Sequence, residues 1–153
     1  DQALNDAILE ARRRLGSLDT SILQLFAMNR IKDISSVEQE VVEFDKEIRI
    51  VKQNLDNIID TDALKKNEAE IGYVRTKYSE FSENLSRYGY RLQKAAETLR
   101  NAEQEKEMPI DQTVLKGIYD DTRLNTDNLS RTFQDLIDFN KQLIDNKISF
   151  FTR

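Results

Sequence analysis

The chain has 153 residues, of which 33% are charged and 39% hydrophobic, so its length fits one domain or one elongated segment. Four glycines and one proline supply too few turns for a many-stranded β-fold, and the composition therefore predicts an all-α protein. The sequence contains no cysteine and no histidine, which excludes disulfides, Cys/His zinc sites and the nucleophile systems that use a histidine base.

The first predicted element is a coiled-coil strand in the amino-terminal part of the chain. Its apolar residues are spaced alternately by four and three, which is the a/d seam of a heptad repeat; they are Leu4, Ile8, Ala11, Leu15, Leu18, Ile22 and Leu25. The pattern breaks near residues 30–36. There, Ser35 and Glu38 have the spacing of a capping box, which predicts the start of a new helix.

Two further heptad runs follow the break and predict the two strands of a hairpin. The first run consists of Val37, Val41, Phe44, Ile48, Val51, Leu55 and Ile58. The second lies in a helix expected from about Asp62 to Glu107, because Pro109 cannot continue a helical hydrogen-bond ladder. Its seam includes Asn67, Ile71, Val74, Tyr78, Phe81 and Leu85. A polar residue at a seam position, such as Asn67, is typical of a device that fixes register.

The two runs match each other in an antiparallel register with a turn near residues 59–63. Phe44 then lies opposite Tyr78, and the flanking charges agree, since Asp45 lies opposite Arg75. This register predicts that the two helices form an antiparallel coiled coil.

The first element also matches the long third helix, with Leu25 opposite Leu92, but five residues out of the hairpin register. Such a shift requires one strand to bulge, and we place that bulge near residues 30–36. Residues 1–107 are therefore expected to form an interrupted antiparallel coiled-coil hairpin.

Residues 108–153 form a second predicted segment with additional helices. Asp111 can cap a short helix that ends near Asp121, and Thr126 or Asp127 can cap a last helix that runs toward Thr152. The apolar stripe of the last helix is wider than a coiled-coil seam and needs more than one neighbour. It consists of Leu129, Phe133, Leu136, Ile137, Leu143, Ile144, Phe150 and Phe151. It fits a helix that folds back to make a three-helix bundle, pairs with chain upstream of residue 1, or forms a subunit contact.

No residue has the pattern of a catalytic, cofactor-binding or metal-binding group. Two pairs of aspartates, at 60/62 and 120/121, lie at predicted helix ends and lack the spacing of a metal-binding loop. The glycine-rich phosphate loops and the H-E-x-x-H metal motif do not occur. Any nucleotide chemistry would lie in another part of a longer protein, and the first residue, which is not methionine, also suggests an excerpt of one.

The charge pattern indicates little affinity for nucleic acid or membranes. The net charge is −5 without a polybasic tract, and Arg12, Arg13 and Arg14 are the only run of three cations. We expect this run to be a solvated coil face, although it is the one candidate for weak DNA contact. Tyr73 and Tyr90 lie off the seam and are retained as candidate contact residues for stacking with a single nucleic-acid strand. Because no apolar run approaches the length of a membrane span and no signal peptide precedes the first helix, we expect a cytoplasmic protein.

The segment from Leu115 to Arg153 resembles the carboxyl-terminal coiled-coil region of bacterial SMC-like ABC ATPases, an uncharacterised-domain family associated with defence or mobile loci. The resemblance is carried by Leu115 and Tyr119, then by Phe133, Leu136, Phe139, Asn140, Leu143, Asn146, Lys147 and Phe150. Asn140 and Lys147 depart from the His and Arg that are usual in the family. We expect partner contacts from Phe133, Leu136, Phe139, Asn140, Phe150 and Phe151.

The resemblance implies a non-catalytic arm or tip of an ATPase that acts in DNA maintenance or anti-phage and mobile-element defence. Its role would be that of a mechanical spacer and of a dimerisation or partner-docking element. The partners would be proteins, through self-association or an accessory subunit, with DNA bound at most weakly and no small-molecule substrate or cofactor. The alternative is a stand-alone structural or interaction module, such as a spectrin-like three-helix spacer or a filament segment.

Overall fold

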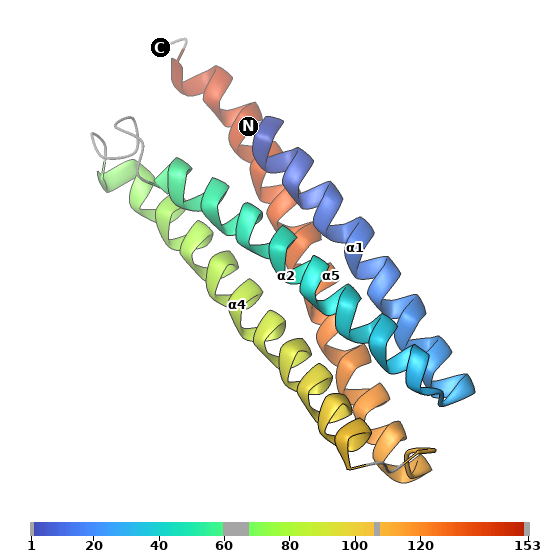
Figure 1. Ribbon diagram of the computed structural model, residues 1–153. Helices are drawn as coiled ribbons and strands as arrows, with labels where there is room; N and C mark the ends of the chain where they lie inside the picture. The colour runs from blue at the N-terminus through green and yellow to red at the C-terminus, as the bar shows by residue number, and fades with distance from the viewer. Residues whose placement is uncertain (1, 60–67, 106–107, 152–153) are drawn as a thin grey trace.

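The computed structural model describes residues 2–59, 68–105 and 108–151. This part of the chain contains four α-helices and no β-strand (Figure 1). The helices are α1 (Gln2–Met28), α2 (Ile31–Ile59), α4 (Glu68–Gln104) and α5 (Gln112–Phe151). The prediction of an all-α protein is therefore confirmed.

Each helix packs antiparallel to its neighbour in the chain, and α5 closes the bundle against α1 (Figure 1). A single hydrophobic core runs through all four helices, so it joins the predicted segments 1–107 and 108–153. The predicted seam of α1 is buried at every position from Leu4 to Leu25. Heptad spacing thus identified which face of α1 is buried.

The break after α1 is a reversal of the chain and not a bulge. Residues 31–36 are helical, and the predicted capping box of Ser35 and Glu38 lies inside α2. Because the chain turns back at residues 29–30, α1 and α4 run in the same direction on opposite sides of the bundle (Figure 1). The antiparallel pairing of α1 with α4 was wrong, since a seam pattern specifies a buried face and not a direction.

The seam of α2 is buried as predicted, but its register against α4 is different. Gln93 donates a hydrogen bond of 2.6 Å to Asp45, and Arg100 donates one of 3.2 Å to Glu38. The predicted register placed Asp45 opposite Arg75, so α2 faces a later part of α4 than expected. The shift from Arg75 to Gln93 is 18 residues, which is five turns of an α-helix, so both registers turn the same face of α4 toward α2. The predicted turn falls mostly on residues 60–67, which lie outside the described residues, as does Asn67.

The carboxyl-terminal segment is one continuous helix instead of two. Asp111 does cap it, because its Oδ1 accepts hydrogen bonds from the backbone N–H groups of Thr113 and Val114. Thr126 and Asp127 both lie inside α5, so neither caps a helix. Thr126 is buried, and its hydroxyl donates to the Arg123 carbonyl oxygen at 3.0 Å. Of the three arrangements left open by the sequence, α5 adopts the one that folds back, in contact with both α1 and α4.

Asn29 ties together the two connections at one end of the bundle. Its backbone has a φ of 48°, in the left-handed region, and its N–H donates to the Leu25 carbonyl oxygen as α1 ends. The side-chain amide donates to the Ile110 carbonyl oxygen at 2.8 Å and accepts from the Ile110 N–H at 3.1 Å. The turn between α1 and α2 is thereby fixed to the connection between α4 and α5.

We expect Asn29→Ala to lower the free energy of unfolding by about 2 kcal/mol, because it removes two hydrogen bonds and strains the left-handed backbone. Asn29→Gly should cost only about 1 kcal/mol, since glycine adopts this φ without strain. Urea denaturation of the two variants separates the loss of the hydrogen bonds from the strain of the left-handed backbone. Equal stability of Asn29→Ala and the original chain would show that the link carries no energy.

Candidate functional site

The residues expected to contact a partner lie inside the bundle. Phe133 and Leu136 are fully buried, and Phe139 is 9% exposed. The Phe133 ring packs edge-on against Phe44 of α2, with 6.3 Å between ring centroids. The partner-contact prediction was therefore wrong for these three residues, because the apolar stripe of α5 packs against the other helices of the bundle. The side chains of Phe150 and Phe151 lie outside the described residues.

Phe139 is the centre of an aromatic cluster between α4 and α5. The rings of Tyr73, Tyr78 and Phe81 approach it with centroid distances of 6.1, 5.5 and 5.9 Å. Tyr78 is buried, whereas Tyr73 is 65% exposed at the rim. Edge-on and tilted ring pairs of this kind add stability beyond the buried area. Apart from Tyr73, the cluster belongs to the hydrophobic core.

Asn140 was also expected to contact a partner, and the structure instead gives it a bonding role within the bundle. The Tyr78 hydroxyl donates a 2.6 Å hydrogen bond to Asn140 Oδ1, and Asn140 Nδ2 donates to Asn5 Oδ1 at 3.2 Å. Tyr78 and Asn140 are 2% and 4% exposed. This chain of hydrogen bonds links α4, α5 and α1 at a single level, which favours one alignment of the three helices.

Burial raises the pKa of the Tyr78 hydroxyl to about 12. The phenol is therefore protonated at neutral pH and serves as a hydrogen-bond donor to Asn140. Such a group is a poor general base or acid near pH 7, where a catalytic pKa would be expected. The network has the features of a structural element and not of a reaction centre.

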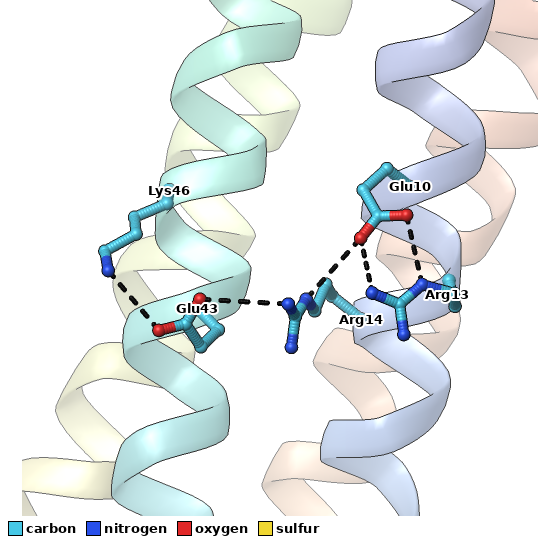
Figure 2. A network of polar contacts seen from close by, with 5 residues as sticks. All are labelled: Glu10, Arg13, Arg14, Glu43 and Lys46. Carbon is cyan, nitrogen blue, oxygen red and sulfur yellow. Dashed lines mark hydrogen bonds and ion pairs between the residues drawn. The ribbon is translucent and has the colours of Figure 1, made fainter.

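Two residues of the arginine run, Arg13 and Arg14, form ion pairs with glutamates (Figure 2). Arg13 donates to Glu10, which lowers the pKa of the Glu10 carboxyl. Arg14 lies 3.7 Å from Glu10 and 3.9 Å from Glu43 of α2, and Glu43 also pairs with Lys46. These contacts join α1 to α2 and neutralise two of the three arginines, which weakens the case for DNA contact there.

Arg12 differs from its two neighbours in the run. It is exposed and has no carboxylate partner among the described residues. One cation on a chain of net charge −5 supplies little affinity for a phosphate backbone.

A shallow groove of about 360 Å³ lies between α4 and α5 near the end that Asn29 closes. Its walls are Arg91, Lys94, Ala95 and Thr98 of α4 and Thr113, Val114, Gly117, Ile118 and Asp121 of α5. A Cβ atom at Gly117 would meet no atom within 4 Å, so the groove is open above this residue.

A row of cations follows the α4 side of the groove. Arg87, Arg91 and Lys94 are spaced by four and three residues, so they share one exposed face of the helix. Lys94 pairs with Glu97 at 3.2 Å and lies over the ring of Tyr90, which is 58% exposed. Sequence reasoning missed this row, although residues 84–96 contain three cations and no acidic residue.

A second cavity is enclosed by all four helices and has a volume of only about 10 Å³. That is room for about one water molecule, so it is not a substrate pocket. Among the described residues, no three acidic side chains come close enough together to hold a metal ion. None of the described helices contains an apolar stretch long enough to cross a membrane.

No protein-family model, curated protein or solved structure matches this chain. The resemblance to SMC-like ABC ATPases therefore rests on the spacing of residues in α5 alone.

Proposed function

We propose that this chain is a non-catalytic helical module at the end of an antiparallel coiled-coil arm, and that the arm belongs to an SMC-like ABC ATPase of DNA maintenance or defence. In this role the module spaces, dimerises or docks protein partners, while nucleotide chemistry occurs elsewhere in the parent protein. The resemblance of α5 to that family supports the choice of parent. The arrangement of the helices supports the choice of role.

The observation that carries the proposal is that α1 begins and α5 finishes at the same end of the bundle, side by side and antiparallel (Figure 1). Asn5 is hydrogen-bonded to Asn140, so the last turns of α5 extend past the first turn of α1. Helices that continued α1 upstream and α5 downstream would therefore lie together as the two strands of a hairpin arm.

The same observation argues against a spectrin-like spacer. A spacer in a linear array needs its chain to enter at one end and leave at the other, so that successive units follow along a rod. Here both ends of the described chain point the same way (Figure 1). The geometry favours a terminal position on an arm over a position within an array.

The proposal can be tested by fusing designed heptad strands to both ends, an acidic strand before residue 1 and a basic strand after residue 153. We expect the strands to pair within one chain and to lengthen the particle by about 1.5 Å per added residue in small-angle X-ray scattering. The added strands should unfold on heating without dissociation of subunits.

A matched control carries acidic strands at both ends, whose charges repel in the e and g positions. This control should show no lengthened rod. If the acidic and basic strands pair between two chains, as a doubled mass in light scattering would reveal, the two ends of the bundle do not support an arm and the proposal fails.

A further inference from the structure

We infer that the groove between α4 and α5 docks an acidic amphipathic segment of a partner protein. This inference rests on the proposed role as an interaction module, and it adds the surface and the chemistry of the partner. The groove is lined by Arg91 and Lys94 on one side and by Val114, Gly117 and Asp121 on the other. Arg87 lies beyond the groove lining, one turn before Arg91 on the same face of α4.

Charge is the first argument for an acidic partner. Many cations in the described part of the chain are paired with carboxylates, as Arg13, Arg14 and Arg123 are. Arg87 and Arg91 are exposed and have no carboxylate partner among the described residues. Acidic groups nearby are Asp121 on the opposite wall, Glu97, which pairs with Lys94, and Glu83, which lies one turn before Arg87. The two arginines thus remain available for carboxylates of another chain, which they can bind in a bidentate manner.

Shape is the second argument, and it specifies an apolar component. Gly117 and Ala95 leave the middle of the groove open, and Val114 at its edge is 50% exposed. An apolar side chain of a partner would cover Val114 and fill the space above Gly117. A segment with acidic residues along one side and apolar residues along the other satisfies both features, as helices docked in grooves do.

A nucleic-acid strand fits this surface less well than a peptide. The cationic row from Arg87 to Lys94 spans only about 10 Å along the helix, and Asp121 would repel phosphates from the facing wall. The net charge of −5 also opposes the approach of a polyanion of any length. A short acidic peptide needs only the local cations.

The test is a selection of peptides from a random phage-displayed library on the intact chain. We expect enriched peptides to be acidic, with apolar residues at helical spacing, and to bind more weakly as the salt concentration rises. The double variant Arg87→Glu/Arg91→Glu should weaken their binding by about 10-fold or more, as the loss of central charged contacts does. Gly117→Leu should weaken it similarly, because the leucine fills the groove.

Matched variants separate these effects from general changes in charge or helix stability. Arg12→Glu/Lys32→Glu changes the net charge by the same amount on exposed residues of α1 and α2. Gly16→Leu adds the same side chain at a glycine of α1 that also has open space around it. Both controls should leave peptide binding within about 2-fold of the original chain. Circular dichroism of every variant verifies that the helices are intact.

Three results would overturn the inference. The first is that no peptide is enriched, and the second is that the enriched peptides bind the groove variants as tightly as the controls. The third is that a poly-dT oligonucleotide binds more tightly than the peptides and competes with them, which would assign the groove to nucleic acid. None of these results affects pairing of the fused heptad strands, so failure of the groove and failure of the arm can be distinguished.

Discussion

Phe133→Ala is expected to lower the free energy of unfolding of the isolated chain by about 3 to 5 kcal/mol. The side chain is fully buried and packs against Phe44, so truncation removes the transfer free energy of a phenyl ring and leaves a cavity. A domain of this size has a total stability of about 5 to 15 kcal/mol. The variant should therefore unfold at a much lower urea concentration than the original chain.

The same substitution discriminates between the two roles considered for Phe133. A residue that contacted only a partner would leave the stability of the isolated chain almost unchanged when truncated. Urea denaturation followed by circular dichroism makes the measurement, with Leu124→Ala as the control on the same helix. Leu124 is 55% exposed and should cost less than about 0.5 kcal/mol. Equal, small losses for both variants would contradict the buried position of α5.

The sequence predicted the helices and their buried faces because apolar spacing reports directly on which face is covered. Leu4 to Leu25 of α1 and Val37 to Leu55 of α2 are buried at the predicted seam positions. The direction of packing was not predictable in the same way. A chain reversal of two residues at Asn29 is a local feature, and its hydrogen bonds to Ile110 involve a residue far away in the sequence.

The interior of α5 was the least predictable part of the fold. Apolar spacing identified Leu129, Phe133 and Leu136, but Thr122 and Asn125 are buried as well, at 1% and 0% exposure. The predicted break, from Asp121 to Thr126, falls on these two buried residues. In the structure the backbone simply continues, and Asn125 Nδ2 donates to the Asp121 carbonyl oxygen of the preceding turn. Small polar side chains can satisfy part of their bonding within their own helix.

The candidate groove could not be predicted from the sequence, although the residues on one of its walls could be recognised. The cations of α4 were visible as a segment free of acidic residues, yet seam analysis assigns such a segment to an ordinary solvated face. Its opposite wall, from Thr113 to Asp121, is supplied by a different helix whose alignment with α4 was unknown. A groove between two helices emerges only when their register is fixed.

The second large effect that we expect is a loss of stability at high pH that depends on Tyr78. Burial holds the pKa of its hydroxyl at about 12 in the folded chain, above the value of about 10 for an exposed tyrosine. Below pH 10 the Tyr78 hydroxyl is protonated in both the folded and the unfolded chain, and its contribution to the free energy of unfolding is fully present. Between pH 10 and 12 the unfolded chain loses this proton first, so stability falls as the pH rises. The loss should reach about 2 to 3 kcal/mol near pH 12.

Tyr78→Phe isolates this contribution. At pH 7 the variant should be less stable by about 1 to 3 kcal/mol, because buried Asn140 Oδ1 loses its donor. As the pH rises from 10 toward 12 the difference between the two chains should shrink, since only the original chain has a buried phenol to ionise. Urea denaturation over this pH range measures the difference, with Tyr73→Phe as a control that alters an exposed ring of the same cluster. A difference that stays constant with pH would mean that Tyr78 ionises equally easily in the folded and unfolded chains, which would contradict the buried position of its hydroxyl.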